Sequence, residues 1–191
     1  MYKRLDMSDS IRVPPEHLGE DVNESVVGAL SKNVEGNIFE DAGVVLAVEE
    51  VTSVEGGKIE PEDAGIHYDV EFTAIAYQPE LQEVVEGEVV DITSFGAFIR
   101  IGPLDGLCHV SQIMDEYVNM DEENNMLVSE EGEKTLEIGD FVTSRMIAVS
   151  MKNQDSNKIN LTMRQPGLGK EEWIELYEEE QAEEDDEEGD N

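Results

Sequence analysis

The stretch GEVVDITSFGAFIRIGPLDGLCHVSQI, residues 87–113, decides the fold of the C-terminal half of the chain. Its short apolar segments are separated by glycine turns, which is typical of short antiparallel strands. Two aromatic residues, Phe95 and Phe98, stand three positions apart beside Gly96. Regular alternation along a strand would send their rings to opposite faces. A bulge at Gly96 would instead turn both rings to one side, so we expect both rings to be partly exposed.

The strand that follows carries a cysteine and a histidine next to each other. Neighbouring strand residues point to opposite faces, so a Cys108 in the core would place His109 outside, near the phenylalanines. Arg100 has the parity of Phe98 and would extend the same surface. Such a face forms a platform on which nucleic-acid bases can stack. The alternative is that the phenylalanines belong to the core, which is the commoner place for aromatic residues.

The rest of the C-terminal half continues the pattern of short strands. An acidic insertion, residues 115–134, interrupts it and could form an extra hairpin with Tyr117, Val118, Leu127 and Val128 as its apolar positions. Roughly even spacing of five strands predicts an all-β, oligonucleotide-binding barrel over residues 81–168. The five expected strands are residues 84–93, 95–101, 106–110, 141–151 and 158–164.

Residues 1–80 predict a separate α+β domain, in which a helix covers one face of an antiparallel sheet. Pro14 and Pro15 end a first strand and open a helical segment, which we expect to stop at Gly36. Two more strands follow, at residues 42–51 and 66–77. The expected core positions are Val22, Val26, Val27, Leu30 and Val34 on the helix, Val44, Leu46 and Val48 on one strand, and Tyr68, Val70, Phe72, Ala74 and Ala76 on the other.

The chain is strongly acidic, with 47 acids against 12 bases and a formal charge of −35 in 191 residues. Residues 171–190 hold 13 acids and no base, and the rest still carry 34 acids and 12 bases. Like charge at this density destabilises a folded domain unless salt screens it. We therefore expect a halophilic source with a salt-rich cytosol, the alternative being an acidic partner-binding protein of ordinary habitat. For residues 169–191 we expect a short helix and a disordered acidic tail.

Other features of the sequence limit the function. A single cysteine excludes an internal disulfide, and opposite-facing side chains at Cys108 and His109 argue against a nucleophile–base pair. We expect no metal site, because the run at residues 121–125 lacks the glycine and distal glutamate of a calcium loop. With no apolar run of membrane length and no signal-peptide core, we expect a cytoplasmic binding protein without a catalytic site, a cofactor or a membrane contact.

Residues 87–113, with LEIGDFVTSRMIAVS and KINLTMRQP, closely resemble the S-one RNA-binding domain, which is named after a ribosomal protein. Residues 1–176 as a whole resemble the family of the E-prime subunit of archaeal DNA-dependent RNA polymerase, the counterpart of the seventh subunit of eukaryotic polymerase II. That resemblance implies a protein of the polymerase stalk. The expected partners are the polymerase core near its clamp, the smaller F subunit of RNA polymerase and nascent single-stranded RNA.

The resemblance also implies which residues would make these contacts. It places an RNA-binding base on Lys158 and a docking tip on the turn of Pro14 and Pro15 and the loop from Lys58 to His67. The alternative function is a translation or RNA-decay factor that uses the same barrel. The expected RNA-binding residues are Phe95, Phe98, Arg100, His109, Lys152 and Lys158, and the expected polymerase-docking residues are Pro14, Pro15, Lys58, Ile59 and His67.

Overall fold

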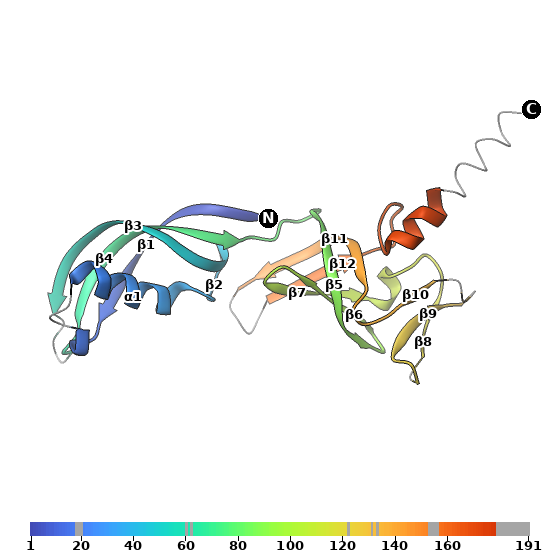
Figure 1. Cartoon of the computed structure of the whole chain (residues 1–191), viewed down its shortest axis with the longest axis horizontal. Helices are drawn as coiled ribbons and strands as arrows, with labels where there is room; N and C mark the ends of the chain where they lie inside the picture. The colour runs from blue at the N-terminus through green and yellow to red at the C-terminus, as the bar shows by residue number, and fades with distance from the viewer. Residues whose placement is uncertain are drawn as a thin grey trace, which may run out of the picture. The chain divides into compact units, whose positions relative to one another are not determined.

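The computed structural model describes residues 1–17, 21–59, 61, 63–121, 123–130, 132, 134–152 and 157–178. The chain divides into two compact units, of which the first holds Met1–Pro79 with Met151–Asn157 and the second holds Glu80–Ser150 with the chain from Lys158 onward. The N-terminal unit is a four-stranded antiparallel sheet with a helix, and the C-terminal unit is built on a closed five-stranded barrel (Figure 1). The fold class predicted from the sequence is confirmed. None of the helices in the described part of the chain is long and apolar enough to cross a membrane.

The N-terminal sheet has the strand order β1-β4-β3-β2. Its long strands are β1 (Tyr2–Val13), β3 (Gly43–Ile59) and β4 (Ile66–Tyr77), and β2 (Ile38–Phe39) is a short edge strand. β4 pairs with β1 on one side and with β3 on the other along its whole length. The expected order of strand, helix and two strands is therefore correct, with β2 as an addition.

The helix α1 (Val22–Val34) follows a short 3₁₀ turn, η1 (Pro15–His17). Asp21 caps its N-terminus by accepting a hydrogen bond from the amide of Asn23, at 2.8 Å. Gly36 adopts a φ of +78° just after the last helical turn, as expected of the glycine that stops a helix. The buried stripe is narrower than predicted, because Val26, Leu30 and Val34 are buried whereas Val22 and Val27 are exposed.

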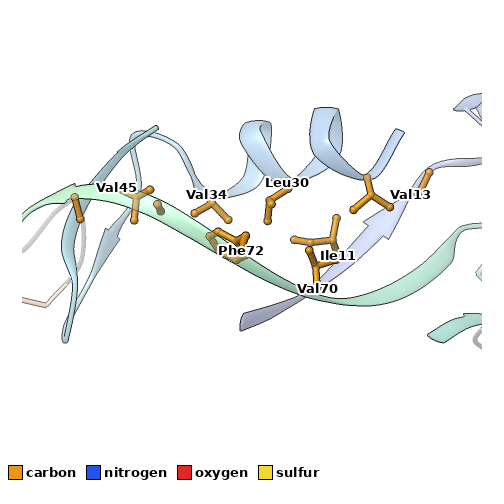
Figure 2. Packing of buried hydrophobic residues seen from close by; sticks show 10 residues of the cluster. Ile11, Val13, Leu30, Val34, Val45, Val70 and Phe72 are labelled. Atoms are coloured by element: carbon orange, nitrogen blue, oxygen red, sulfur yellow. The ribbon is translucent and has the colours of Figure 1, made fainter. Parts of the chain in front are cut away.

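The core of the N-terminal unit lies between α1 and the sheet (Figure 2). β4 contributes Val70, Phe72, Ala74 and Ala76, as its alternation predicted, and Tyr68 packs against them. The prediction for β3 is correct only in part. The register of β3 against β4 shifts four times, and three of these shifts fall between Val45 and Ser53, so the core positions recur every third residue instead of every second. Val45, Val48, Val51 and Val54 pack in the core cluster, so Val48 was predicted correctly, whereas Leu46 lies outside the cluster and Val44 is buried outside it.

The barrel has the strand order β11-β12-β7-β6-β5 and is closed. Its strands are β5 (Val84–Thr93), β6 (Gly96–Ile101), β7 (Leu104–His109), β11 (Phe141–Met151) and β12 (Asn157–Thr162). β5, β6 and β7 form an antiparallel meander, and β12 runs parallel to β7. The small residues Ala97 and Cys108 are fully buried, as are Ile99 and Leu161, so the barrel interior is filled by side chains.

The acidic insertion forms a small sheet of its own. It holds β8 (Val118–Asp121) and β9 (Met126–Ser129), which pair as the expected hairpin, and β10 (Thr135–Leu136) pairs with β9. Val118 and Leu127 are buried, as their apolar character predicted, but Tyr117 is exposed.

A helical segment at residues 171–178 follows the barrel. Its Trp173 is buried against Gly169, where a Cβ would come within 2.5 Å of the indole ring. Gly169 in turn exchanges two backbone hydrogen bonds of 2.8 Å with Thr143 of β11, which attaches this segment to the barrel. The predicted acidic tail from residue 179 onward lies outside the described residues.

Candidate nucleic-acid interface

The connection between β5 and β6 is a two-residue turn made of Ser94 and Phe95. Gly96 opens β6 at a point where the backbone of β7 lies very close. A Cβ at this position would stand 2.2 Å from the carbonyl oxygen of Cys108, so only glycine fits without moving a strand. The hydroxyl of Thr93 closes the turn by donating to the carbonyl of Gly96 at 2.9 Å.

The predicted bulge at Gly96 is wrong, because Gly96 pairs directly with Thr93 and with His109. The register shift lies on β5 instead, between Val89 and Asp91. Phe95 escapes strand alternation for a different reason, which is that it belongs to the turn and not to β6.

The two phenylalanines nevertheless lie on the same side. Their ring centroids are 6.1 Å apart and their planes meet at 87°, which is an edge-to-face contact. Phe95 is 47% exposed and Phe98 is partly buried. The rings are therefore not sealed in the barrel interior, whereas their strand neighbours Ala97 and Ile99 are.

His109 points outward from the end of β7, and the adjacent Cys108 points inward and is fully buried. The Nδ1 atom of His109 accepts a hydrogen bond from the amide of Ser111 at 3.2 Å and lies 2.9 Å from its hydroxyl. Because Nδ1 accepts, a neutral ring carries its proton on Nε2, which leaves a donor free for a ligand. We call the surface of Phe95, Phe98 and His109 the aromatic face.

The thiol of Cys108 takes no part in this face. It donates to the carbonyl of Gln112 over 3.4 Å, and burial raises its pKa to about 12. A thiol with this pKa is almost entirely protonated at neutral pH, and it is an inert core residue.

The expected basic residues are distributed unevenly. Lys158 is exposed on β12 and shares a side with Asn160, which pairs with Leu107 beside Phe98, so Lys158 lies on the side of the barrel that carries the aromatic face, two residues along β12 from the level of Phe98. Arg100 has the same orientation, but its Nε is held by Asp105 across the strands at 3.2 Å. Lys152 directly follows the last residue of β11.

The aromatic face has uncharged and acidic neighbours that pattern analysis missed. Asn160 and Leu107 extend it across β12 and β7, and Asp91 pairs with Phe98 from the β5 side. The parity of each strand would have identified them, but only with the register between strands known. Within the described ranges, no group of three or more His, Cys, Asp and Glu side chains is placed to hold a metal ion.

The expected docking residues come together at one end of the N-terminal sheet. Arg12 on β1 and Lys58 on β3 both pair with His67 on β4, so the turn after β1 and the loop between β3 and β4 are neighbours. Ile59 is 68% exposed. We call this end, which carries Pro14, Pro15, Lys58, Ile59 and His67, the tip.

Asp63 holds the tip together, and sequence analysis missed it. Its carboxylate forms a bidentate pair with Arg12, with distances of 2.7 and 2.6 Å, and accepts from the amide of Gly65 at 2.9 Å. His67 approaches the same carboxylate to 3.1 Å. The hydrogen bond from Arg12, followed by those of Gly65 and His67, lowers the pKa of Asp63 far below its usual value.

Comparison with known proteins covers nearly the whole chain. The family model described as "SHS2 domain found in N terminus of Rpb7p/Rpc25p/MJ0397" matches residues 8–64, and "S1 RNA binding domain" matches residues 78–164. The DNA-directed RNA polymerase subunit Rpo7 of Saccharolobus shibatae is 39% identical over 175 residues, which cover 91% of this chain and 97% of the relative. The chain belongs to the Rpo7 family.

The Rpo7 family assignment confirms the predicted kinship with the E-prime subunit of the polymerase. A more distant relative is the DNA-directed RNA polymerase III subunit RPC8 of Bos taurus, 24% identical over 77% of this chain and 75% of its own. Among solved structures, RNase R of Mycoplasma genitalium is 25% identical over 42% of this chain and 13% of its own, with a TM-score of 0.37. The Rpo7 match includes the N-terminal half, which favours a polymerase subunit over a translation or RNA-decay factor.

Proposed function

We propose that this chain is the stalk subunit of DNA-dependent RNA polymerase and that its barrel binds emerging single-stranded RNA on the aromatic face. The observation that supports RNA binding is the exposed ring of Phe95, in edge-to-face contact with the partly buried ring of Phe98, beside an outward His109. Bases of any sequence can stack on such rings, and the free Nε2–H of His109 can donate to a base edge or a phosphate.

The charges favour stacking over phosphate contacts as the main source of affinity. Lys158 and Arg100 are exposed bases on the same side of the barrel, and Arg100 shares its charge with Asp105 in a solvent-exposed pair. With so few cations, counterion release contributes little, and the dependence of affinity on salt should be shallow. This is compatible with RNA binding by a strongly acidic chain.

The RNA-binding proposal is tested by measuring the affinity of the full chain for fluorescent single-stranded RNA. Phe98→Ala and His109→Ala should weaken binding, Phe98→Ala by about 5- to 100-fold for one lost stacking partner. Phe141→Ala is the matched control, because Phe141 is 74% exposed on the same barrel but two strands from β6. Unchanged affinity in both variants, with a folded barrel, would contradict RNA binding at the aromatic face.

We further propose that the tip docks on the polymerase core near the clamp. The exposed Ile59 and the prolines offer apolar surface, and the pair of Arg12 and Asp63 fixes the loop that presents them. Ile59→Glu should abolish co-purification with the large polymerase subunits. Val27→Glu, an equally drastic change on the exposed side of α1, should leave it intact. Equal recovery of both variants would count against docking through the tip.

The remaining parts of the proposal follow from the family resemblance. The chain would pair with the smaller F subunit of the polymerase, support promoter opening and act in the cytoplasm, without a catalytic site of its own. Co-expression with the F subunit and a promoter-opening assay on polymerase lacking this chain test these roles. Cleavage of RNA by the purified chain alone would contradict the non-catalytic role.

A further inference from the structure

A hollow of about 370 Å³ lies between the turn before β6 and the inserted hairpin, and Ser94, Ser111, Asp115, Tyr117 and Arg164 line part of it. We call it the hairpin groove. Its volume falls within the range of about 300–1,000 Å³ that small-molecule sites occupy. It is large enough to accept part of a nucleotide.

The hairpin groove is continuous with the aromatic face. Ser94 directly precedes Phe95, and the amide of Val110, which also lines the groove, donates to the carbonyl of Phe95 at 2.9 Å. Ser111 lines the groove and touches the Nδ1 of His109 through its hydroxyl. A strand that passes over Phe95 and His109 therefore reaches the groove without leaving the protein surface.

The wall of the hairpin groove includes an aromatic ring on a fixed backbone. The carbonyl of Tyr117 accepts a hydrogen bond from the amide of Glu130 at 2.8 Å, and the next residue, Val118, is buried at the start of β8. The side chain of Tyr117 is nevertheless 70% exposed. An exposed ring whose main chain is already ordered can stack on a base at little further cost in entropy.

The hairpin groove also contains an arginine, Arg164, whose guanidinium can exchange its present carboxylate partner for a phosphate. Arg164 meets Asp115 at 3.1 Å, but their side chains are 52% and 71% exposed, so water screens this pair. A phosphate can compete with Asp115 for the guanidinium, which binds phosphate in a fork geometry. The other acid of the groove, Glu116, is paired with Lys134 at 3.2 Å and repels an incoming phosphate less for that reason.

We propose that the hairpin groove is a second RNA subsite, in which Tyr117 stacks on a base and Arg164 contacts the adjoining phosphate of the strand that crosses the aromatic face. This inference rests on the proposed RNA-binding function and extends it. The inserted hairpin then has a role of its own, which is to lengthen the RNA path beyond the barrel.

The test compares two single-stranded RNAs on the full chain, one of about four nucleotides and one of about ten. Tyr117→Ala should lower the affinity for the longer RNA by about 5- to 100-fold and leave the shorter RNA unaffected. Tyr117→Phe, which keeps the ring, should restore the affinity. Arg164→Gln should reduce the slope of log affinity against log salt by about 0.7 on the longer RNA, as for one lost phosphate contact.

The outcomes separate this inference from the proposed function. If Phe98→Ala weakens both RNAs and Tyr117→Ala weakens neither, the second subsite is wrong and the aromatic face stands. If Tyr117→Ala leaves RNA affinity unchanged but lowers recovery with polymerase, Tyr117 is a protein contact and the inference is overturned. If neither Phe98→Ala nor His109→Ala changes the affinity for either RNA, RNA binding at the aromatic face fails and the subsite fails with it.

Discussion

At Gly96 two strands of the barrel come so close that no side chain fits between them. An added Cβ would meet the carbonyl oxygen of Cys108 at 2.2 Å and the Cα of His109 at 2.9 Å, and both are backbone atoms that cannot yield cheaply. We expect Gly96→Ala to lower the free energy of unfolding of the barrel by more than about 2 kcal/mol, through overpacking and backbone strain. Denaturant unfolding of the two proteins measures this difference.

The control for this variant is Gly139→Ala. Gly139 also has a positive φ, of +94°, but a Cβ there would meet no atom within 4 Å. Gly139→Ala should therefore lower the free energy of unfolding only through backbone strain, by about 1 kcal/mol. Equal losses in the two variants would show that close approach of the strands is not what requires glycine at position 96.

Asp63 makes the tip sensitive to acid. Because its pKa is lowered in the folded protein, its stabilising effect is complete above the unfolded value near 3.8 and is lost as the pH falls toward the folded value. We expect the amide of Gly65, which donates to Asp63, to stay protected from hydrogen exchange from neutral pH down to about 4 and to lose protection in stronger acid.

Substitutions at two aspartates test this assignment. Asp63→Asn should remove the protection of Gly65 at every pH, since an amide cannot form the charged bidentate pair with Arg12. Asp69→Asn is the control, because Asp69 meets Lys58 over 3.8 Å and both side chains are well exposed. If Asp63→Asn protects Gly65 as well as the wild-type chain does, the carboxylate does not hold the loop.

Among the elements, β3 shows most directly which features sequence patterns do not predict. Alternation in β4 was read correctly because that strand is regular over its whole length, and the covering helix followed from its 3.6-residue period. In β3 each register shift moves the following residues to the other face of the sheet, so Val44, Leu46 and Val48 do not all lie on the same face. Bulges depend on the partner strand, and the local sequence of β3 does not reveal them.

The bulged register of β3 has a measurable consequence. Val45 is fully buried in the core cluster, whereas Leu46 is partly exposed and outside it. Val45→Ala should lower stability by about 2 kcal/mol through lost burial and a small cavity, and Leu46→Ala by less than half of that. Protection of the β4 amides from hydrogen exchange measures the change in stability. A larger loss in Leu46→Ala than in Val45→Ala would contradict the register.

The candidate site was predictable in part for similar reasons. The opposite orientations of Cys108 and His109 follow from strand parity alone, and the structure has them. The same-side placement of Phe95 and Phe98 was expected from a bulge but arises from a turn, because the turn residues cannot be told from strand residues in this sequence. Asp63 was missed, since its role depends on the distant Arg12.

At the scale of the whole molecule, the net negative charge is the main influence on stability. The negative charges behind the net charge of −35 repel one another within about one Debye length. This length is about 10 Å at 0.1 M salt and about 3 Å at 1 M. We expect the melting temperature to rise by about 5 °C or more between these salt concentrations, as screening removes a few kcal/mol of repulsion.

The matched control is the same pair of melts at pH 4.1, the isoelectric point of the sequence. With the net charge near zero, salt has little repulsion to screen, and the difference in melting temperature should shrink. A salt response of equal size at both pH values would mean that general solvent effects, and not self-repulsion, control stability.

The place of β12 in the barrel also governs when the barrel can form. β12 lies between β11 and β7, so β11 and β7 each keep an unpaired edge until the ribosome has synthesised the chain as far as Thr162. The N-terminal sheet is complete much earlier, because residues 1–77 contain all of its strands. During synthesis the first unit can thus fold early, and the nascent barrel waits with two unprotected edges. Dense negative charge on the growing chain would keep neighbouring polypeptides on a polysome from adding to those edges.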